Sequence, residues 1–219
     1  MPECRELPVE EGANVTHNDN RAPADVPSEV TEMVPTWDDE YIDRVSDRLM
    51  HNFDLERDYV VSGESFQLYG ELRMVARKRF FHPALNYGDH ERRGYVFTRR
   101  CEDPTVESIE ALVDLGHTLA NEWIEADEEH YETSFTFVLV VDAIPDDVRS
   151  FVDGFRDRTL LKYGYFGHYE IIPLVVAPRR KVIVAGEAAE LADAFALWRD
   201  LENGSRSLWS AIADRLLPG

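Results

Sequence analysis

Two short stretches of the chain carry the same three residues, two of which have side chains that bind metals. Residues 130–132 and 168–170 both read His-Tyr-Glu, and each precedes an apolar run. Side chains two residues apart in a strand point to the same face of a sheet. If the two strands are neighbours, two imidazoles and two carboxylates converge, which suits zinc or another divalent metal. The candidate ligands are His130, Glu132, His168 and Glu170. The competing interpretation is that these polar residues at strand starts are simply solvated.

A metal-dependent hydrolase or nuclease could be built on the same groups. Such an enzyme needs carboxylates and a lysine around a metal at a strand end. Asp142 follows one of the strands, and Lys162 and Lys181 lie nearby in the sequence. The spacing of an acid, one residue and a lysine is absent from the strands, however. The glycine-rich phosphate loop, the dinucleotide fingerprint, the cysteine pair of a zinc site and the Gly-x-Ser-x-Gly elbow are absent as well.

A basic stretch is the second feature that could do chemistry. Residues 73–100 hold eight cations against two acids, a local balance of +6 in a chain whose net charge is −20. Aromatic residues are interleaved, so the stretch could hold phosphates and stack bases. The alternative is an internal or oligomer contact, because residues 102–157 carry sixteen acids. The candidate binding residues are Arg73, Arg77, Lys78, Arg79, Arg92, Arg93, Arg99 and Arg100.

A stretch rich in glycine and aromatic residues, 162–168, allows two interpretations. It could be a mobile loop that contacts a ligand. The simpler interpretation, which we favour, is a turn between a helix and a strand, with aromatic residues at the edge of the core, because glycine there needs only a backbone reason.

The overall composition indicates a soluble protein adapted to molar salt. Forty-three acids face 23 cations, of which only three are lysines, while hydrophobic residues still make up 44% of the chain. A high net charge opposes association, and dense salt screens the self-repulsion that this charge causes. Two cysteines, no signal peptide and no long apolar run predict a cytoplasmic location without a membrane partner.

Hydrophobic periodicity predicts several strands and helices in a mixed order. Thr36 is expected to cap a first helix that ends before Phe53. Strands are expected over 59–61, 66–81, 94–99, 133–141, 169–177 and 181–185, and helices over 105–125, 145–155, 188–201 and 207–217. This order predicts an α+β fold, with a mostly antiparallel or mixed β-sheet covered by helices. We expect a disordered acidic tail over 1–35, one domain over 36–202 and a C-terminal helix over 203–219.

Three stretches resemble an uncharacterised archaeal family, a domain of unknown function common in haloarchaea. They are residues 51–56 running into the strand at 66–79, residues 129–135, and residues 163–171. The resemblance covers about residues 38–187. It implies a cytosolic archaeal protein, and it brings no activity, cofactor or catalytic residue with it.

The sequence therefore favours a non-enzymatic binding or regulatory module, with the metal-dependent hydrolase or nuclease as the alternative. The expected partner is a protein or a phosphate-bearing ligand. Nucleic acid is less favoured, because molar salt weakens binding to phosphates steeply. No cofactor is expected, and the oligomeric state is left open.

Overall fold

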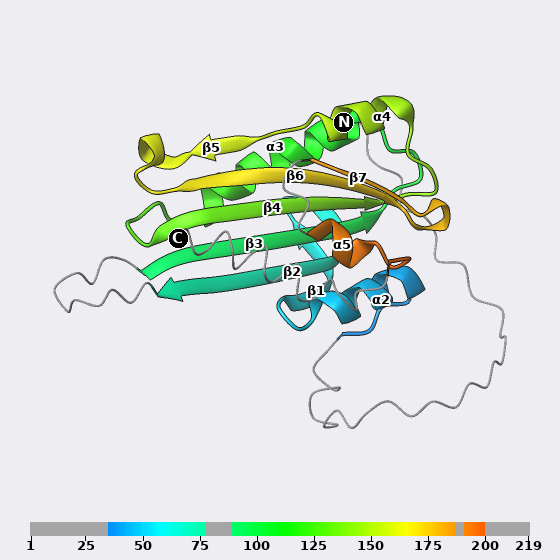
Figure 1. Ribbon diagram of the computed structural model, residues 1–219, viewed down its shortest axis with the longest axis horizontal. Coiled ribbons are helices and arrows are strands. Elements are labelled where there is room, and N and C mark those ends of the chain that lie inside the picture. The colour runs from blue at the N-terminus through cyan, green and yellow to red at the C-terminus, as the bar shows by residue number, and fades with distance from the viewer. Residues whose placement is uncertain (1–34, 78–88, 187–190, 200–219) are drawn as a thin grey trace, which may run out of the picture.

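The computed structural model describes residues 35–77, 89–186 and 191–199. Within these ranges, seven strands form one mixed sheet with helices on both faces, which confirms the predicted fold class (Figure 1). The predicted tail over 1–35 falls almost entirely outside the described residues, and the C-terminal helix over 203–219 falls wholly outside them. In chain order the elements are α2 (Glu40–Leu49), β1 (Asp54–Val61), β2 (Glu64–Arg77), β3 (Asp89–Arg100), α3 (Val106–Trp123), β4 (His130–Val140), α4 (Asp146–Asp153), β5 (Arg158–Leu160), the 3-10 turn η1 (Leu161–Gly164), β6 (His168–Ala177), the 3-10 turn η2 (Pro178–Arg180), β7 (Val182–Ala185) and α5 (Ala192–Phe195).

The strand order is β1-β2-β3-β4-β6-β5, and β7 also pairs with β6. Neighbours β1–β2, β2–β3, β5–β6 and β6–β7 are antiparallel, whereas β3–β4 and β4–β6 are parallel. The two parallel pairs are joined through α3 and α4, because a parallel connection has to cross over the sheet. Successive side chains of β4 point to opposite faces of the sheet, so they pack in two separate core layers. Phe135 and Phe137 pack in the layer of α3, whereas Val138 and Val140 pack in the layer of α2 and α5.

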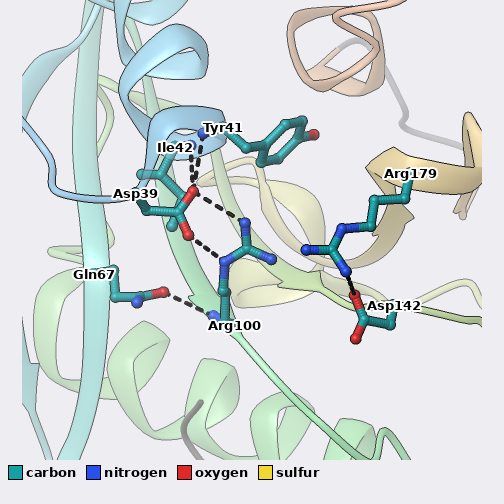
Figure 2. A network of polar contacts seen from close by, with 7 residues as sticks. All are labelled: Asp39, Tyr41, Ile42, Gln67, Arg100, Asp142 and Arg179. Atoms are coloured by element: carbon teal, nitrogen blue, oxygen red, sulfur yellow. Dashed lines mark hydrogen bonds and ion pairs between the residues drawn. The ribbon is translucent and has the colours of Figure 1, made fainter. Parts of the chain in front are cut away.

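The helix α2 begins at a different cap from the one expected. Asp39, rather than Thr36, accepts hydrogen bonds from the backbone N–H groups of Tyr41 (2.9 Å) and Ile42 (3.1 Å). The same carboxylate pairs with Arg100 at the end of β3, so it ties the helix to the sheet (Figure 2). A carboxylate can cap the helix and pair with an arginine at once. A threonine hydroxyl can only cap the helix, because it carries no charge.

Several elements differ from the prediction, and both β1 and β3 begin five residues earlier than expected. Of the helix expected over 188–201, the described residues show only the four-residue α5. Residues 196–199 are described and are not helical, so the prediction is wrong there, whereas 188–190 and 200–201 lie outside the described residues. The three-residue strand β5 was not predicted at all, because three residues carry too little periodicity to reveal a strand. Its position matters for the candidate site, since it places Arg158 beside Glu170 of β6.

Candidate functional site

The amino ends of β4 and β6 lie side by side, and the polar residues there form two rows across four strands. The pairing of Glu132 with His168 fixes the register of the two parallel strands. Towards the amino ends of β4 and β6 the sheet face is polar, whereas α2 and α5 pack over apolar residues nearer the carboxyl ends. The first row is Arg92, Glu132, His168 and Leu160, and the second is Gly94, Ser134, Glu170 and Arg158.

Three of the four predicted metal ligands meet in these rows. Glu132, His168 and Glu170, which we call the acid–histidine cluster, each offer one ligand atom, and these atoms all lie within 4.8 Å of one another. Nε2 of His168 lies 3.5 Å from Oε1 of Glu170 and 4.0 Å from Oε2 of Glu132. The histidine side chain is 8% exposed, and the two glutamates are 23% and 20% exposed. The cluster is thus held on a rigid sheet and still reached by solvent.

These separations are close to what a metal ion needs. Bonds of about 2.1 Å in a tetrahedral site place neighbouring ligand atoms about 3.4 Å apart. The separation between His168 and Glu170 already has that value within about 0.1 Å. The separation between His168 and Glu132 is about 0.6 Å longer than this value, and all three ligand atoms lie within 4.8 Å of one another. The Glu132 side chain therefore has to turn inward for the three groups to bind one divalent ion.

Two arginines flank the cluster and compete with a metal for its ligands. Arg92 pairs with Oε2 of Glu132 at 3.0 Å, and Nε of Arg158 lies 3.7 Å from Glu170. Nη2 of Arg158 also donates to Nδ1 of His168 at 3.3 Å. Because arginine only donates, this contact places the proton of a neutral imidazole on Nε2, facing the carboxylates. A metal bound at Nε2 would replace that proton and move it to Nδ1, so Arg158, which is exposed, would have to turn away.

The fourth predicted ligand, His130, does not join the cluster, so the prediction is wrong for this residue. A bulge lies between the pairs Glu91–His130 and Arg92–Glu132, so Tyr131 is an extra residue on β4. The extra residue breaks the alternation and puts His130 out of phase with Glu132. Nε2 of His130 contacts Oγ1 of Thr133 at 2.9 Å, and Nδ1 contacts the carbonyl oxygen of Phe166 at 2.6 Å. His130 thus anchors the loop after β5.

The structure also separates Asp142 from the other groups of the enzyme alternative. Asp142 follows the carboxyl end of β4, ten residues along from Glu132, which is about 33 Å at the rise of a strand. It pairs there with Arg179 at 3.7 Å, close to Arg100 (Figure 2). A single site containing both Asp142 and the acid–histidine cluster is therefore not formed.

The basic stretch is divided between the two faces of the sheet. Arg92 and Arg100 lie on the face of α2, and Arg93 and Arg99 alternate with them on the face of α3. The five arginines with described side chains all pair with acids: Arg73 and Arg93 with Glu91, Arg92 with Glu132, Arg99 with Glu64, and Arg100 with Asp39. The hydrogen bond from Arg93 lowers the pKa of the Glu91 carboxyl below its ordinary value. Lys78 and Arg79 lie outside the described residues, as does the side chain of Arg77, so a phosphate-binding role stays a prediction for these three.

The aromatic stretch forms the turn between β5 and β6. It follows a strand rather than a helix, and Tyr163 and Tyr165 are 96% and 87% exposed, so they do not cover the core. The expectation of edge aromatics packed on the core is therefore wrong for both tyrosines. The sequence signal that could have revealed this was the pair of glycines, Gly164 and Gly167, both of which have positive φ.

Comparisons with known proteins give a family and no activity. A family model described as a domain of unknown function matches residues 38–197. The match begins where the resemblance noted in the sequence begins and extends ten residues further. No curated protein and no solved structure matches the chain. Among the described residues, none of the helices is long and apolar enough to cross a membrane.

Proposed function

The chain belongs to the DUF8052 family, which is defined without an activity, and we propose from the geometry of this member that the domain is a binding module built around a divalent metal ion. The observation that carries the proposal is the convergence of Glu132, His168 and Glu170 from two parallel strands. One imidazole and two carboxylates are a donor set for first-row metals such as Zn²⁺ and Mn²⁺. Three protein ligands leave at least one coordination position for water or for a further ligand.

Metal content and metal-dependent stability test this proposal. The full chain, purified in high salt, should retain a divalent ion, and added Zn²⁺ or Mn²⁺ should raise its Tm. A ligand at a hundred times its Kd stabilises a protein by about 2.7 kcal/mol. For a chain of this size that corresponds to a rise of about 5–10 °C. A protein that carries no metal and shows no change in Tm with either ion would refute the metal site.

Matched variants locate the ion. The double variant Glu132→Gln, Glu170→Gln keeps the shape of both side chains and removes the charge that a metal requires. Its metal-dependent rise in Tm should disappear. The control is Glu128→Gln, Glu129→Gln, which removes the same charge from two exposed acids just before β4 and should keep the full rise. Each rise is measured against the same variant without metal, because Arg92 loses its partner when Glu132 is changed.

The position of Arg158 gives the metal site a second test. Because Arg158 donates to Nδ1 of His168, it favours the tautomer that opposes metal binding at Nε2. Arg158→Met removes this donor and keeps an apolar side chain on β5. We expect this variant to bind Zn²⁺ more tightly than the native chain in isothermal titration. Weaker binding would show that Arg158 supports the site rather than competing with it.

The metal-dependent hydrolase or nuclease is the alternative proposal. It loses Asp142, which lies at the other end of β4, and retains the three groups of the cluster. Hydrolysis of phosphomonoesters and phosphodiesters by the metal-loaded chain, abolished in Glu170→Gln, would favour it over a purely binding role.

We also propose that the protein works in the cytoplasm of a halophile. The support is the net charge of −20 together with a core of ordinary hydrophobic content. Salt screens the repulsion among the acids of the folded chain, so the free energy of unfolding in urea should be larger in molar KCl than in dilute buffer. Equal stability in both solutions would speak against this proposal.

A further inference from the structure

The turn between β5 and β6 displays two tyrosines on a backbone that is held in place. We call residues 161–167 the tyrosine loop. The N–H of Leu161 donates to the carbonyl of Gly167 at 3.0 Å, and the N–H of Phe166 donates back to Leu161 at 3.3 Å. Lys162 and Tyr163 both have positive φ, of 47° and 60°, a conformation that residues with a side chain seldom adopt. The backbone of the loop is therefore held in one specific shape.

This loop is fixed against the start of β4, next to the acid–histidine cluster. His130 contacts the carbonyl of Phe166, and a Cβ at Gly167 would lie 1.9 Å from the carbonyl oxygen of Tyr131. The close approach means that the loop rests directly on the start of β4. Tyr131 in turn lies beside the cluster, since its ring centroid is 6.3 Å from that of His168 and 5.1 Å from the guanidinium carbon of Arg92. The loop and the cluster therefore lie next to each other, since Leu160 pairs with His168, at the end of the sheet where β2 ends and β6 begins (Figure 1).

Exposed apolar side chains gather at this one place. Among the described residues, five large hydrophobic side chains are exposed, and four of them are on or beside the tyrosine loop. Scattered single exposures are normal on a protein surface, whereas a group suggests a contact surface. The four are Tyr131, Leu160, Tyr163 and Tyr165, and the fifth, Val60, is on β1 at the opposite edge of the sheet.

The segment that carries the tyrosine loop is basic, although Glu132 and Glu170 lie beside it. Residues 156–168 carry three cations, Arg156, Arg158 and Lys162, against one acid in a protein of net charge −20. The acid, Asp157, faces away to His117, whose Nε2 lies 3.0 Å from its carboxylate. Arg158 and Lys162 are both exposed. Aromatic rings next to exposed cations suit a ligand that joins a planar ring to an anion.

We infer that the tyrosine loop is a stacking surface for a free nucleotide, whose phosphate is held by Arg158 and Lys162. Base–aromatic stacking tolerates every base, because each base has a π-face, and a guanidinium pairs well with phosphate oxygens. This inference rests on the proposed metal site in one respect only: an ion in the acid–histidine cluster would supply a further partner for the phosphate. Stacking on the tyrosines does not require the ion.

The test is nucleotide binding by the full chain. Adenosine monophosphate, uridine monophosphate and a short single-stranded oligonucleotide are titrated by calorimetry, each with Mn²⁺ and with a chelator. We expect saturable binding of both monophosphates to the native chain. Tyr163→Ser, Tyr165→Ser should weaken it by about tenfold or more, since loss of a stacked base typically has that effect. Tyr163→Phe, Tyr165→Phe preserves the rings and should stay within about twofold of the native affinity, on the same reasoning.

Controls separate this result from unfolding and from failure of the metal site. Val60→Ser removes an exposed apolar side chain at the far edge of the sheet and should leave nucleotide binding unchanged. The serine double variant should keep the native Tm and the native affinity for Mn²⁺ alone. The inference is overturned if the native chain binds no nucleotide, or if the serine variant binds as well as the native chain. Nucleotide binding that persists with the chelator supports the inference. It shows only that a metal ion does not contribute to binding the phosphate. An oligonucleotide that binds no more tightly than the monophosphates identifies the free nucleotide as the ligand.

Discussion

Replacing Asp39 tests how α2 is fastened to the sheet. Oδ1 of Asp39 accepts the first N–H groups of the helix, from Tyr41 and Ile42, and also a hydrogen bond from Nη2 of Arg100 at 3.0 Å (Figure 2). Nε of Arg100 binds the other carboxylate oxygen, while the backbone N–H of Arg100 donates to Oε1 of Gln67 at 2.9 Å. One side chain therefore serves both as the helix cap and as the counter-charge of a half-buried arginine.

The two roles have different magnitudes, and two variants distinguish them. Loss of a capping side chain costs about 1 kcal/mol. Loss of the charged partner of Arg100, which is 25% exposed, costs about 1.5–3 kcal/mol. Asn is as good a cap as Asp, so Asp39→Asn should lose only the second contribution. Asp39→Ala should lose both, about 2.5–4 kcal/mol in total, which is a large part of the stability of an ordinary domain.

Urea unfolding in molar KCl measures both differences. The expected order of the free energy of unfolding is native, then Asp39→Asn, then Asp39→Ala, with unchanged m-values. Arg100→Met provides the control, because in that background the change from Asp39 to Asn should cost much less. If Asp39→Asn were as stable as the native chain, the pairing with Arg100 would contribute nothing. If the alanine and asparagine variants were equal, the cap would contribute nothing.

The same pair predicts a pH dependence. Burial alone would raise the pKa of the Asp39 carboxyl, but Arg100 and the backbone donors Ile42 and Tyr41 outweigh it, so the pKa lies below its ordinary value. The folded protein therefore binds this proton less readily than the unfolded chain. The resulting stability is present above the unfolded pKa of about 4 and is lost as the pH falls through the lower folded pKa. The difference in unfolding free energy between the native chain and Asp39→Asn should shrink between about pH 5 and pH 3. A difference that stays constant over this interval would contradict the assignment.

Two glycines give further predictions. At Gly116 of α3 a Cβ would lie 3.0 Å from the ring of Phe137, so Gly116→Ala should overpack the core and lower the urea unfolding free energy by about 1 kcal/mol despite the better helix propensity of alanine. An unchanged or larger free energy would show that the neighbouring side chains move aside freely. At Gly167 a Cβ would collide with the carbonyl of Tyr131, so Gly167→Ala should cost about 2 kcal/mol or more and loosen the tyrosine loop, which hydrogen exchange would detect. Gly164→Ala is the control, because no atom lies near a Cβ there and only the positive φ opposes the substitution, at a cost of about 1 kcal/mol. If Gly164→Ala and Gly167→Ala destabilised the protein equally, the close contact at Gly167 would be refuted.

The sequence by itself determined most of the elements and three of the four proposed metal ligands. Alternation and helical periodicity located β2, β4, β6, α3 and α4, because burying one face of an element requires a regular pattern along it. The repeated His-Tyr-Glu stretches predicted that Glu132, His168 and Glu170 converge if their strands are neighbours, and the condition is fulfilled. The same periodicity was misleading for His130. A single extra residue in β4 changes the face of the sheet to which His130 points, and such a bulge cannot be recognised from the sequence pattern.

Only the tertiary structure decided which charges meet. The arginines at 92, 99 and 100 lie in one short stretch of the sequence. In the structure they are divided between the two faces and both ends of the sheet, where they pair with Glu132, Glu64 and Asp39. Arg158 is brought to Glu170 by a three-residue strand that no periodicity reveals. The physical reason is that hydrophobic patterns are local and repeat along the chain, whereas an ion pair depends on strand order and register, which are set by packing across the whole sheet.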